Sequence, residues 1–470
     1  MAPKKPSGKT EEPVSSGSSS WVGLKVSEFD ETRPSSAKAL LLYGSKAQGT
    51  FVQDSRPRGS GAGSAANDYL DSLKASLAGA FLPVGYPHSV SKEYFSYQAW
   101  DTVQAMCSYL RGVLATQALL RGVGVGKEGA TALAATIIWV LKDGSGMVGG
   151  LGFATFCSVG FDVNVKTWRL FADVANNVGL TLDLLAPMAG DYFLLVICVA
   201  NVFKAMCGVS AGATKAALTA HFALRDNMAD VQAKEGSQET AVTLMGLIAG
   251  SWFAMVANES PATVWTAFVL LTLLHTFANY TGVRSLLLPT LSPSRLWLLC
   301  CAWVDSKQAS SPSADSRMTI EHVASLEPLL SLALPGSRGL AAAGPVRVGV
   351  RWADAFGGED AEQFDRSWKV LGGVEQYLLA RKKGAGTPEV VAVLLSGADE
   401  KVEIRAFLHA ALAHRRLCSV PGSSSWLEES YAELSGRGGI DDFTASVAKL
   451  GWDLQRGVLG ARRFRCRVES

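Results

Sequence analysis

The sequence has few charged residues and no strong net charge. Asp, Glu, Lys and Arg make up 18% of its 470 residues, against about 25% in an average soluble protein. The mean hydropathy is positive, at +0.18, and the 44 basic residues nearly balance the 42 acidic ones. This composition argues against a wholly soluble protein and against a fully disordered chain. The lack of a global field gives no reason to expect a nucleic-acid partner.

Motifs typical of catalytic and metal sites are also missing. The eight cysteines form no CxxC pair, so the sequence indicates neither a disulfide framework nor a zinc ribbon. No Ser/His/Asp or Cys/His arrangement can be placed. We therefore expect no enzyme, no cofactor and no metal site. The cysteines are expected to be buried thiols in a reducing compartment; the alternative for Cys300 and Cys301, which follow an apolar segment, is palmitoylation.

Two glycine-rich motifs resemble nucleotide-binding loops. Residues 144–149 match GxGxxG, but the preceding Ala-rich run is more typical of a helix than of the required strand. Residues 122–127 lack the P-loop spacing and its Ser or Thr after the lysine. We expect the glycines of 144–149 to let helices approach closely in a membrane, and those of 122–126 to form a turn between helices. The first interpretation also covers the pairs Gly208/Gly212 and Gly246/Gly250.

Charge is unevenly distributed along the chain. Residues 81–300 contain only 26 of the 86 charged residues. We expect a mainly α-helical protein with a flexible Ser/Gly-rich tail over 1–80, which carries one short strand near 21–26. A helical membrane domain over 81–300, a linker over 301–317 and a soluble α+β domain over 318–470 complete the predicted organisation.

Residues 240–258 and 260–283 are the two segments that clearly reach the length and apolarity of a membrane span. They are predicted to form a hairpin. Basic residues gather at its outer ends, which places those ends and the C-terminal domain in the cytoplasm. Shorter apolar segments either cross within a helical bundle or pack against the bilayer; they are 105–120, 129–141, 144–161, 168–190 and 192–210.

The C-terminal domain shows alternating patterns typical of strands and longer helical patterns. We expect helices over 401–416 and 426–434, and strands over 345–352, 376–381, 389–395 and 464–468. His409 and His414 accompany several arginines on the first of these helices, and we expect them on a solvent-exposed face.

The densest polar cluster spans residues 221–240, between two apolar segments. Asp226, Asp230 and Lys234 follow one another at intervals of four and share a helix face. Gly236 is expected to end that turn, and Ser237 to cap the next helix. The cluster is either a solvated cytoplasmic loop or a ligand or partner site, whose candidate residues are His221, Arg225, Asp226, Asn227, Asp230, Lys234 and Glu235.

A second polar stripe occurs in the segment 168–190. Arg169, Asp173, Asn176 and Asp183 fall near one helical face. Charges on one side of an apolar helix face either a bundle interior or cavity, or the water at a membrane surface. Asp173 and Asn176 are accordingly further candidate ligand-binding residues.

Several unusual strings resemble the RUS (root UVB-sensitive) family. They are FLPVGYPHSV at 81–90, YQAWD at 97–101, GVGVG at 122–126, WRLFAD at 168–173 and above all RDNMADVQAKEGSQET at 225–240. The resemblance covers about residues 81–299. It implies an integral membrane protein without an established catalytic activity, whose plant members are tied to UV-B responses, auxin transport and vitamin B6 balance. It carries no catalytic residue over to this chain.

Two hypotheses about function follow. The first is an intracellular membrane protein that transports or binds a small molecule through the polar residues of the helical domain. The alternative is a non-catalytic membrane scaffold. It would recruit protein partners or other family members through a polar loop at 221–240 and the C-terminal domain. The lipid bilayer is a partner in both.

Overall fold

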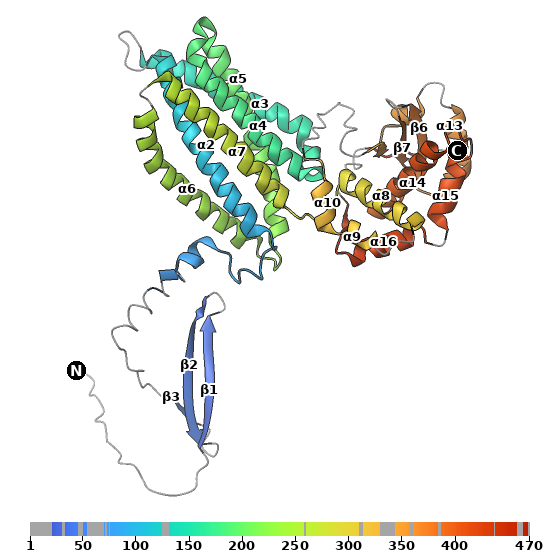
Figure 1. Ribbon diagram of the computed structural model, residues 1–470, viewed down its shortest axis with the longest axis horizontal. Helices are drawn as coiled ribbons and strands as arrows, with labels where there is room; N and C mark the ends of the chain where they lie inside the picture. The colour runs from blue at the N-terminus through green and yellow to red at the C-terminus, as the bar shows by residue number, and fades with distance from the viewer. Residues whose placement is uncertain are drawn as a thin grey trace, which may run out of the picture.

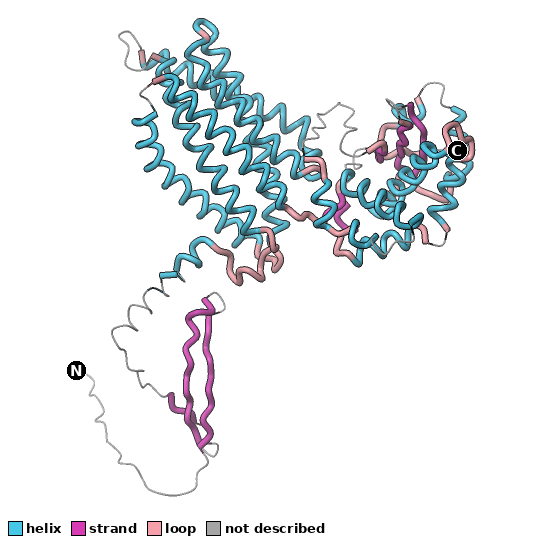
Figure 2. The backbone as a smooth tube through the Cα atoms, viewed as in Figure 1, coloured by secondary structure: helices cyan, strands magenta, loops and turns pink. Residues whose placement is uncertain are grey.

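A computed structural model gives the fold of the chain. It consists of a small N-terminal sheet, a bundle of long helices and a C-terminal domain of helices and strands (Figures 1 and 2). The predicted fold class, mainly helical with a C-terminal α+β part, is confirmed. The structure describes residues 21–30, 33–45, 50–53, 70, 73–74, 76–124, 131–257, 260–309, 314–329, 344–357, 361–383, 387–436, 438–457 and 464–468.

The N-terminal region contains more strand than predicted. An antiparallel sheet in the order β1-β2-β3 is built from β1 (Trp21–Asp30), β2 (Arg33–Ser45) and β3 (Thr50–Gln53). The alternation of Val22, Leu24 and Val26 with Gly and Lys indicates the first strand. The prediction of a single short strand missed its two partners.

Long helices form the middle of the chain. Two short 3₁₀ turns separate α4 from α5. The helices are α2 (Tyr94–Val123), α3 (Ala132–Val163), α4 (Val165–Leu185), α5 (Phe193–Phe222), α6 (Met228–Ala257) and α7 (Pro261–Ser285). Helix α3 joins the apolar segments 129–141 and 144–161 into one element. Helix α6 runs through Gly236, so the predicted break there is wrong; Ser237 Oγ instead donates a hydrogen bond to the Ala233 carbonyl within the helix.

Glycines set the close approach of several helix pairs. A Cβ on Gly146 would lie 2.3 Å from Asn201 Nδ2, and one on Gly149 would lie 2.7 Å from a Val202 methyl group. The GxGxxG match is therefore a helix-packing motif between α3 and α5, as predicted. A Cβ on Gly246 would likewise meet the Tyr109 ring at 2.6 Å. The prediction is wrong for the pair Gly208/Gly212, because a Cβ added at either glycine would meet no atom of a neighbouring helix within 4 Å.

The outer surface of the bundle is apolar. Ile248 is 71% exposed and Phe277 57% exposed, and many large apolar side chains of α3, α6 and α7 are similarly exposed. Among the described residues, two helices are long and apolar enough to cross a membrane: Gly190–Phe222 and Pro261–Ser285. The second matches the predicted span 260–283. The first contains α5, whose apolar part was expected among the shorter segments. The predicted span 240–258 lies in α6, which is not one of these two helices.

The C-terminal domain is built around a three-stranded sheet. Its strands are β5 (Val346–Val348), β7 (Pro388–Leu394) and β6 (Tyr377–Lys383) in that order, with β5 parallel and β6 antiparallel to β7. A parallel bridge between Leu395 and Cys466 extends the sheet edge. The strands predicted near 345–352, 376–381 and 389–395 are therefore confirmed, whereas residues 464–468 form an isolated bridge at Cys466 and not the predicted strand.

Helices surround that sheet. They are α12 (Trp352–Phe356), α13 (Ala361–Leu371), α14 (Glu400–Ser419), α15 (Trp426–Ser435) and α16 (Ile440–Lys449). The short helices α9 (Ala314–Arg317) and α10 (Ile320–Leu326) precede the sheet in the chain. A parallel pair formed by β4 (Thr290–Leu291) and β8 (Asp453–Gly457) brings the end of the domain back to the segment after α7.

The domain core extends further toward the N-terminus than predicted. Helix α8 (Pro293–Ala309) contributes Leu299, Cys300 and Trp303 to the same apolar core as β7 and α14. Residues 301–309 therefore form part of a packed helix. Cys300 is fully buried, and burial raises the pKa of its thiol, so its proposed palmitoylation is wrong. His409 is also fully buried, which contradicts its predicted exposure.

Candidate functional site

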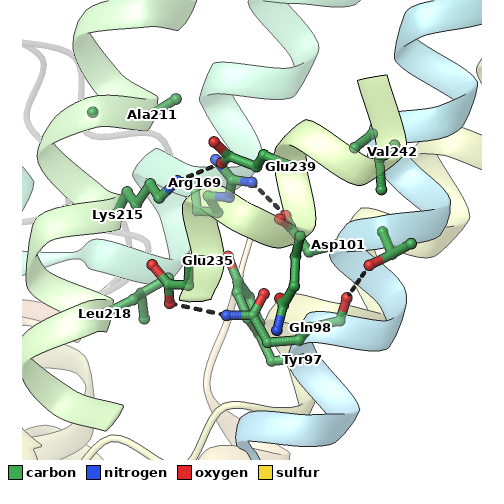
Figure 3. Close-up of a pocket in the computed structure, with 14 residues that line it drawn as sticks. Tyr97, Gln98, Asp101, Arg169, Ala211, Lys215, Leu218, Glu235, Glu239 and Val242 are labelled. Atoms are coloured by element: carbon green, nitrogen blue, oxygen red, sulfur yellow. Dashed lines mark hydrogen bonds and ion pairs between the residues drawn. The ribbon is translucent and has the colours of Figure 1, made fainter. Parts of the chain in front are cut away.

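A cavity of about 300 Å³ lies between α2, α4, α5 and α6 (Figure 3). It sits near the end of the bundle where α5 ends and α6 begins. Tyr97, Leu218 and Val242 give it apolar and aromatic walls. Cavities of about this size and upward hold small molecules in proteins. The cavity is therefore the candidate ligand site of the helical domain.

Ionisable side chains from all four helices line this cavity. Arg169 Nη2 of α4 lies 2.6 Å from Asp101 Oδ1 of α2. Lys215 of α5 forms an ion pair with Glu239 of α6. Figure 3 shows both pairs beside Glu235, the remaining carboxylate of the cavity. Two cations are thus each matched by an acid across a helix interface.

Glu235 is bound by neutral donors instead. Gln98 Nε2 donates a hydrogen bond to Glu235 Oε1 over 2.9 Å, and Thr219 Oγ1 donates one to Oε2 over 3.0 Å. Its residue surface is 5% exposed. Burial raises the pKa of Glu235, while the Thr219 hydrogen bond and the charge of Lys215 oppose that rise.

A buried polar network continues from the cavity into the bundle. Gln104 Nε2 donates a hydrogen bond to Asp173 Oδ1 over 2.7 Å and lies 3.2 Å from His275 Nε2. Two helical turns further along α2, the fully buried Arg111 donates hydrogen bonds to Asn177 and Thr272. Charged groups inside an apolar bundle are expected to face one another in this way.

The predicted polar stripe on α4 faces the bundle interior. Asp173 lies in the buried network, and Asn176 Nδ2 donates a hydrogen bond to Ser108 Oγ over 3.0 Å. Arg169 lines the cavity, whereas Asp183 lies 2.6 Å from Lys204 Nζ of α5 at another interface. Of the two alternatives, the interior position is confirmed and the position at a membrane surface is wrong.

The predicted cluster 221–240 is mostly a support for the segment that precedes α2. Asp230 Oδ2 accepts a hydrogen bond from the Val84 N–H over 2.7 Å, and Lys234 Nζ donates one to the Gly79 carbonyl over 2.6 Å. Helix α6 begins at Met228, so residues 228–240 are helix and not a polar loop. Of the candidate residues predicted in the cluster, Glu235 lines the cavity; Gln238 and Glu239, which were not named as candidates, line it too.

His221 belongs to the same support. Its Nε2 lies 2.5 Å from Glu93 Oε1, just before α2. Burial alone would raise the pKa of Glu93, but the hydrogen bond and charge of His221 outweigh it and lower that pKa. This charge-assisted pair holds the start of α2 against the end of α5.

Arg225, Asp226 and Asn227 form the turn between α5 and α6. Asn227 Oδ1 accepts a hydrogen bond from the Arg225 N–H over 3.2 Å. Asp226 adopts φ +52°, in the left-handed region, which Asp tolerates better than most side chains. The side chains of Arg225 and Asp226 are exposed, and neither bonds to another described residue. This turn does not line the cavity.

The polar residues that α2 contributes to the cavity and to the buried network beyond it were not predicted. Gln98, Asp101, Gln104 and Arg111 are spaced by three, three and seven positions, which places them on one face of that helix. This polar spacing was available in the sequence. Their partners were not, because the partners come from helices that are up to 171 residues away in the chain.

A buried charge cluster joins the bundle to the C-terminal domain. Glu327, just after α10, lies 2.9 Å from Lys166 of α4 and 2.9 Å from Arg295 of α8. Arg284 at the end of α7 donates a hydrogen bond to the Glu327 carbonyl over 3.0 Å. The described residues contain no group of three or more His, Cys, Asp or Glu that could hold a metal ion.

Comparison with known proteins gives a consistent family. Residues 67–307 match the family model described as "Vitamin B6 photo-protection and homoeostasis domain". This span holds the bundle with its cavity, and it ends within α8. No solved structure matches the chain.

Similar curated proteins come from a plant and an amoeba. "Protein root UVB sensitive 3" of Arabidopsis thaliana is 35% identical over 371 residues, which are 76% of this chain and 80% of that protein. "RUS family member 1" of Dictyostelium discoideum is 41% identical over 250 residues, 53% of this chain and 47% of that protein. "Protein root UVB sensitive 6" of Arabidopsis thaliana is 26% identical over 421 residues, 85% of this chain and 80% of that protein.

Proposed function

This chain belongs to the RUS family, and on that premise we propose that its helical bundle is embedded in a membrane and binds a small polar molecule in the cavity between α2, α4, α5 and α6. The role is one of binding or transport, without catalysis. The observation that carries the proposal is the cavity itself: ionisable side chains from four helices converge on a small space inside a bundle whose outer surface is apolar.

The membrane part of the proposal rests on two observations. Helices α5 and α7 are long and apolar enough to cross a bilayer. Large apolar side chains also cover the outside of α3 and α6 over an extent that monomeric soluble proteins rarely expose. The basic residues at the ends of α5 and α7 support a cytoplasmic location for the end of the bundle that holds the cavity.

The binding part of the proposal rests on the cost of placing charge in a bundle. Burying ionised groups is unfavourable unless they are paired, and apolar side chains would fill the same space more stably. In membrane domains, such residues mark the pathways and sites of polar substrates. The family model names vitamin B6 in its description, so pyridoxine, pyridoxamine and pyridoxal phosphate are the first molecules to test.

The test is titration calorimetry of these vitamers with the full-length protein in lipid nanodiscs. Ala211→Trp introduces a bulky side chain into the cavity wall and should abolish binding. Ala216→Trp is the matched control, because Ala216 is an exposed residue of the same helix and does not line the cavity. Binding that survives Ala211→Trp unchanged, or no binding of any vitamer or other small solute, contradicts the proposal.

A second candidate function rests on the turn between α5 and α6. The exposed side chains of Arg225 and Asp226 bond to no described residue, and they lie outside the cavity, so they are free to contact a partner protein. A scaffold role of this kind predicts that Arg225→Ala and Asp226→Ala abolish function in cells but leave solute binding unchanged. Wild-type function of both variants would contradict it.

A further inference from the structure

The charges that line the cavity do not balance. Arg169 is paired with Asp101 and Lys215 with Glu239. Glu235 is left without a salt-bridge partner of its own among the described residues. Lys215 of α5 also lines the cavity, but its ammonium group is already paired with Glu239. The lining therefore has one carboxylate in excess.

Glu235 also has unused hydrogen-bonding capacity. A carboxylate offers about four acceptor positions, and Gln98 and Thr219 occupy one on each oxygen. The side chain is almost fully buried and lines the cavity. A buried carboxylate without a counter-ion is costly, and a positively charged ligand would remove that cost.

The walls near Glu235 suit an organic cation better than a metal ion. Tyr97 lines the same cavity, and aromatic rings attract ammonium groups. Leu218 and Val242 add apolar surface, which a hydrated inorganic cation would not use. The oxygen ligands that a hard metal ion needs are instead engaged by Arg169 and Lys215.

We infer that the cavity selects a small organic cation, which donates an N–H of a protonated amine or ring nitrogen to Glu235. This inference rests on the proposed function and names its substrate class. Arg169 and Lys215 do not repel such a ligand strongly, because each is neutralised by its own acid. An anionic ligand, in contrast, would have to displace Asp101 or Glu239.

The pH dependence follows from the same charge arrangement. Cation binding requires ionised Glu235, and burial raises the pKa of this group, so affinity should fall as the solution is acidified toward that pKa. The other charged groups facing the cavity are Asp101, Arg169, Lys215 and Glu239.

Three probes of nearly equal size test the inference: benzylamine, benzyl alcohol and benzoate. Their affinities for the full-length protein in nanodiscs are measured by titration calorimetry at pH 7.5. We expect benzylamine to bind at least about tenfold more tightly than the alcohol, which corresponds to one charge-assisted hydrogen bond. Glu235→Gln should remove this preference. Glu321→Gln is the control, because Glu321 is an exposed carboxylate that does not line the cavity.

The outcomes separate the two proposals. Binding of all three probes with equal affinity overturns the cation inference and leaves the cavity proposal in place. A cation preference that Glu235→Gln does not alter overturns the role of Glu235. Failure of every probe and every vitamer to bind overturns both. If Glu235→Gln does not fold, the ranking of the three probes with the wild-type protein still decides the question.

Discussion

Lys166 Nζ lies 2.9 Å from Glu327 Oε2, and this buried ion pair connects the helical bundle to the C-terminal domain. The two side chains are 2% and 7% exposed. Glu327 also pairs with Arg295 of α8. One carboxylate therefore holds a cation from each side of the interface. Movements of α4 and of the C-terminal domain should consequently be coupled.

The first prediction concerns this interface. Glu327→Ala leaves Lys166 and Arg295 buried without a counter-ion, and we expect it to destabilise the interface by about 3–5 kcal/mol. Differential scanning calorimetry of the full-length protein measures the change. Glu321→Ala is the control: its pair with Lys92 is largely exposed, so its loss should cost about 0–1 kcal/mol. Equal effects of the two substitutions would contradict the assignment.

The same carboxylate predicts a pH dependence. Burial alone would raise the pKa of Glu327, but the charges of Arg295 and Lys166 outweigh burial and lower it. The lowered pKa makes the interface fully stable above about pH 4.5, the usual value, and less stable as the pH falls through the folded-state pKa. In the wild type, the protection of α10 amides from hydrogen exchange, relative to the intrinsic rate at each pH, should fall in that acidic range. Protection that stays constant would exclude an ionised Glu327.

A second pH-dependent element lies in the core of the C-terminal domain. Ser430 Oγ donates a hydrogen bond to the Leu427 carbonyl and must accept one from His409 Nε2–H. His409 Nδ1 is then an acceptor, to which the Tyr377 hydroxyl donates over 3.0 Å. All these polar atoms are satisfied by a neutral imidazole. Burial lowers the pKa of His409 to about 3.

Protonation of His409 should therefore unfold this core. The neutral imidazole of His409 stabilises the core fully above about pH 6.5, the usual histidine pKa. This stabilisation is lost progressively as the pH falls toward 3. Tyr377→Phe removes one hydrogen bond and should cost about 1 kcal/mol at neutral pH. Hydrogen exchange of β6 and α14 between pH 7 and pH 4 measures both effects. A protection pattern that does not change over this range would contradict the neutral assignment.

Helix packing in the bundle gives a paired prediction. Gly149→Ala places a methyl group 2.7 Å from Val202, so α3 and α5 must move apart and the thermal midpoint should fall. Gly208→Ala has open space around it and should raise stability by up to about 1 kcal/mol through helix propensity. Thermal unfolding in the same detergent compares them. A larger loss for Gly208→Ala would contradict the packing.

The support formed by 221–240 can be tested separately from ligand binding. Asp230→Ala removes the acceptor of the Val84 N–H, and we expect faster hydrogen exchange and proteolysis of residues 76–90. Met228→Ala at the start of the same helix is a control, because its side chain is exposed and has no carboxylate to accept the Val84 N–H. Unaltered exchange of residues 76–90 in Asp230→Ala would contradict the role of Asp230, because the remaining contacts would then be enough to hold the segment.

Local patterns in the sequence predicted most elements of the fold. Alternation of Val346 and Val348 with arginine and glycine indicates β5, and long uncharged runs indicate α3 and α7. Properties that depend on distant partners were not predictable. Cys300 is buried because α8 shares a core with α14, and His409 is buried against Tyr377 of β6 and Ser430 of α15. No periodicity in α8 or α14 shows which element covers each side chain.

The candidate site was predicted in part for the same reason. The spacing of Asp173 and Asn176 correctly indicated a position inside the bundle. Neither residue lines the cavity, and their role in ligand binding stays a prediction. Glu235 was selected for its place in a polar string, although its neighbours Asp230 and Lys234 bind the backbone of 79–84. A charge that holds a neighbouring segment and a charge that faces a cavity look alike in a sequence. Only the tertiary fold separates them.

The measurement that most directly tests the account is the sidedness of α5 in sealed vesicles. Reporter cysteines replace Met188, before this helix, and Leu224, after it, in a background in which the exposed Cys418 is changed to serine. We expect a membrane-impermeant maleimide to label the two reporters from opposite sides, with Leu224→Cys on the side of the C-terminal domain. Labelling of both from the same side would show that α5 does not cross the bilayer and would contradict the proposed membrane-embedded binding site.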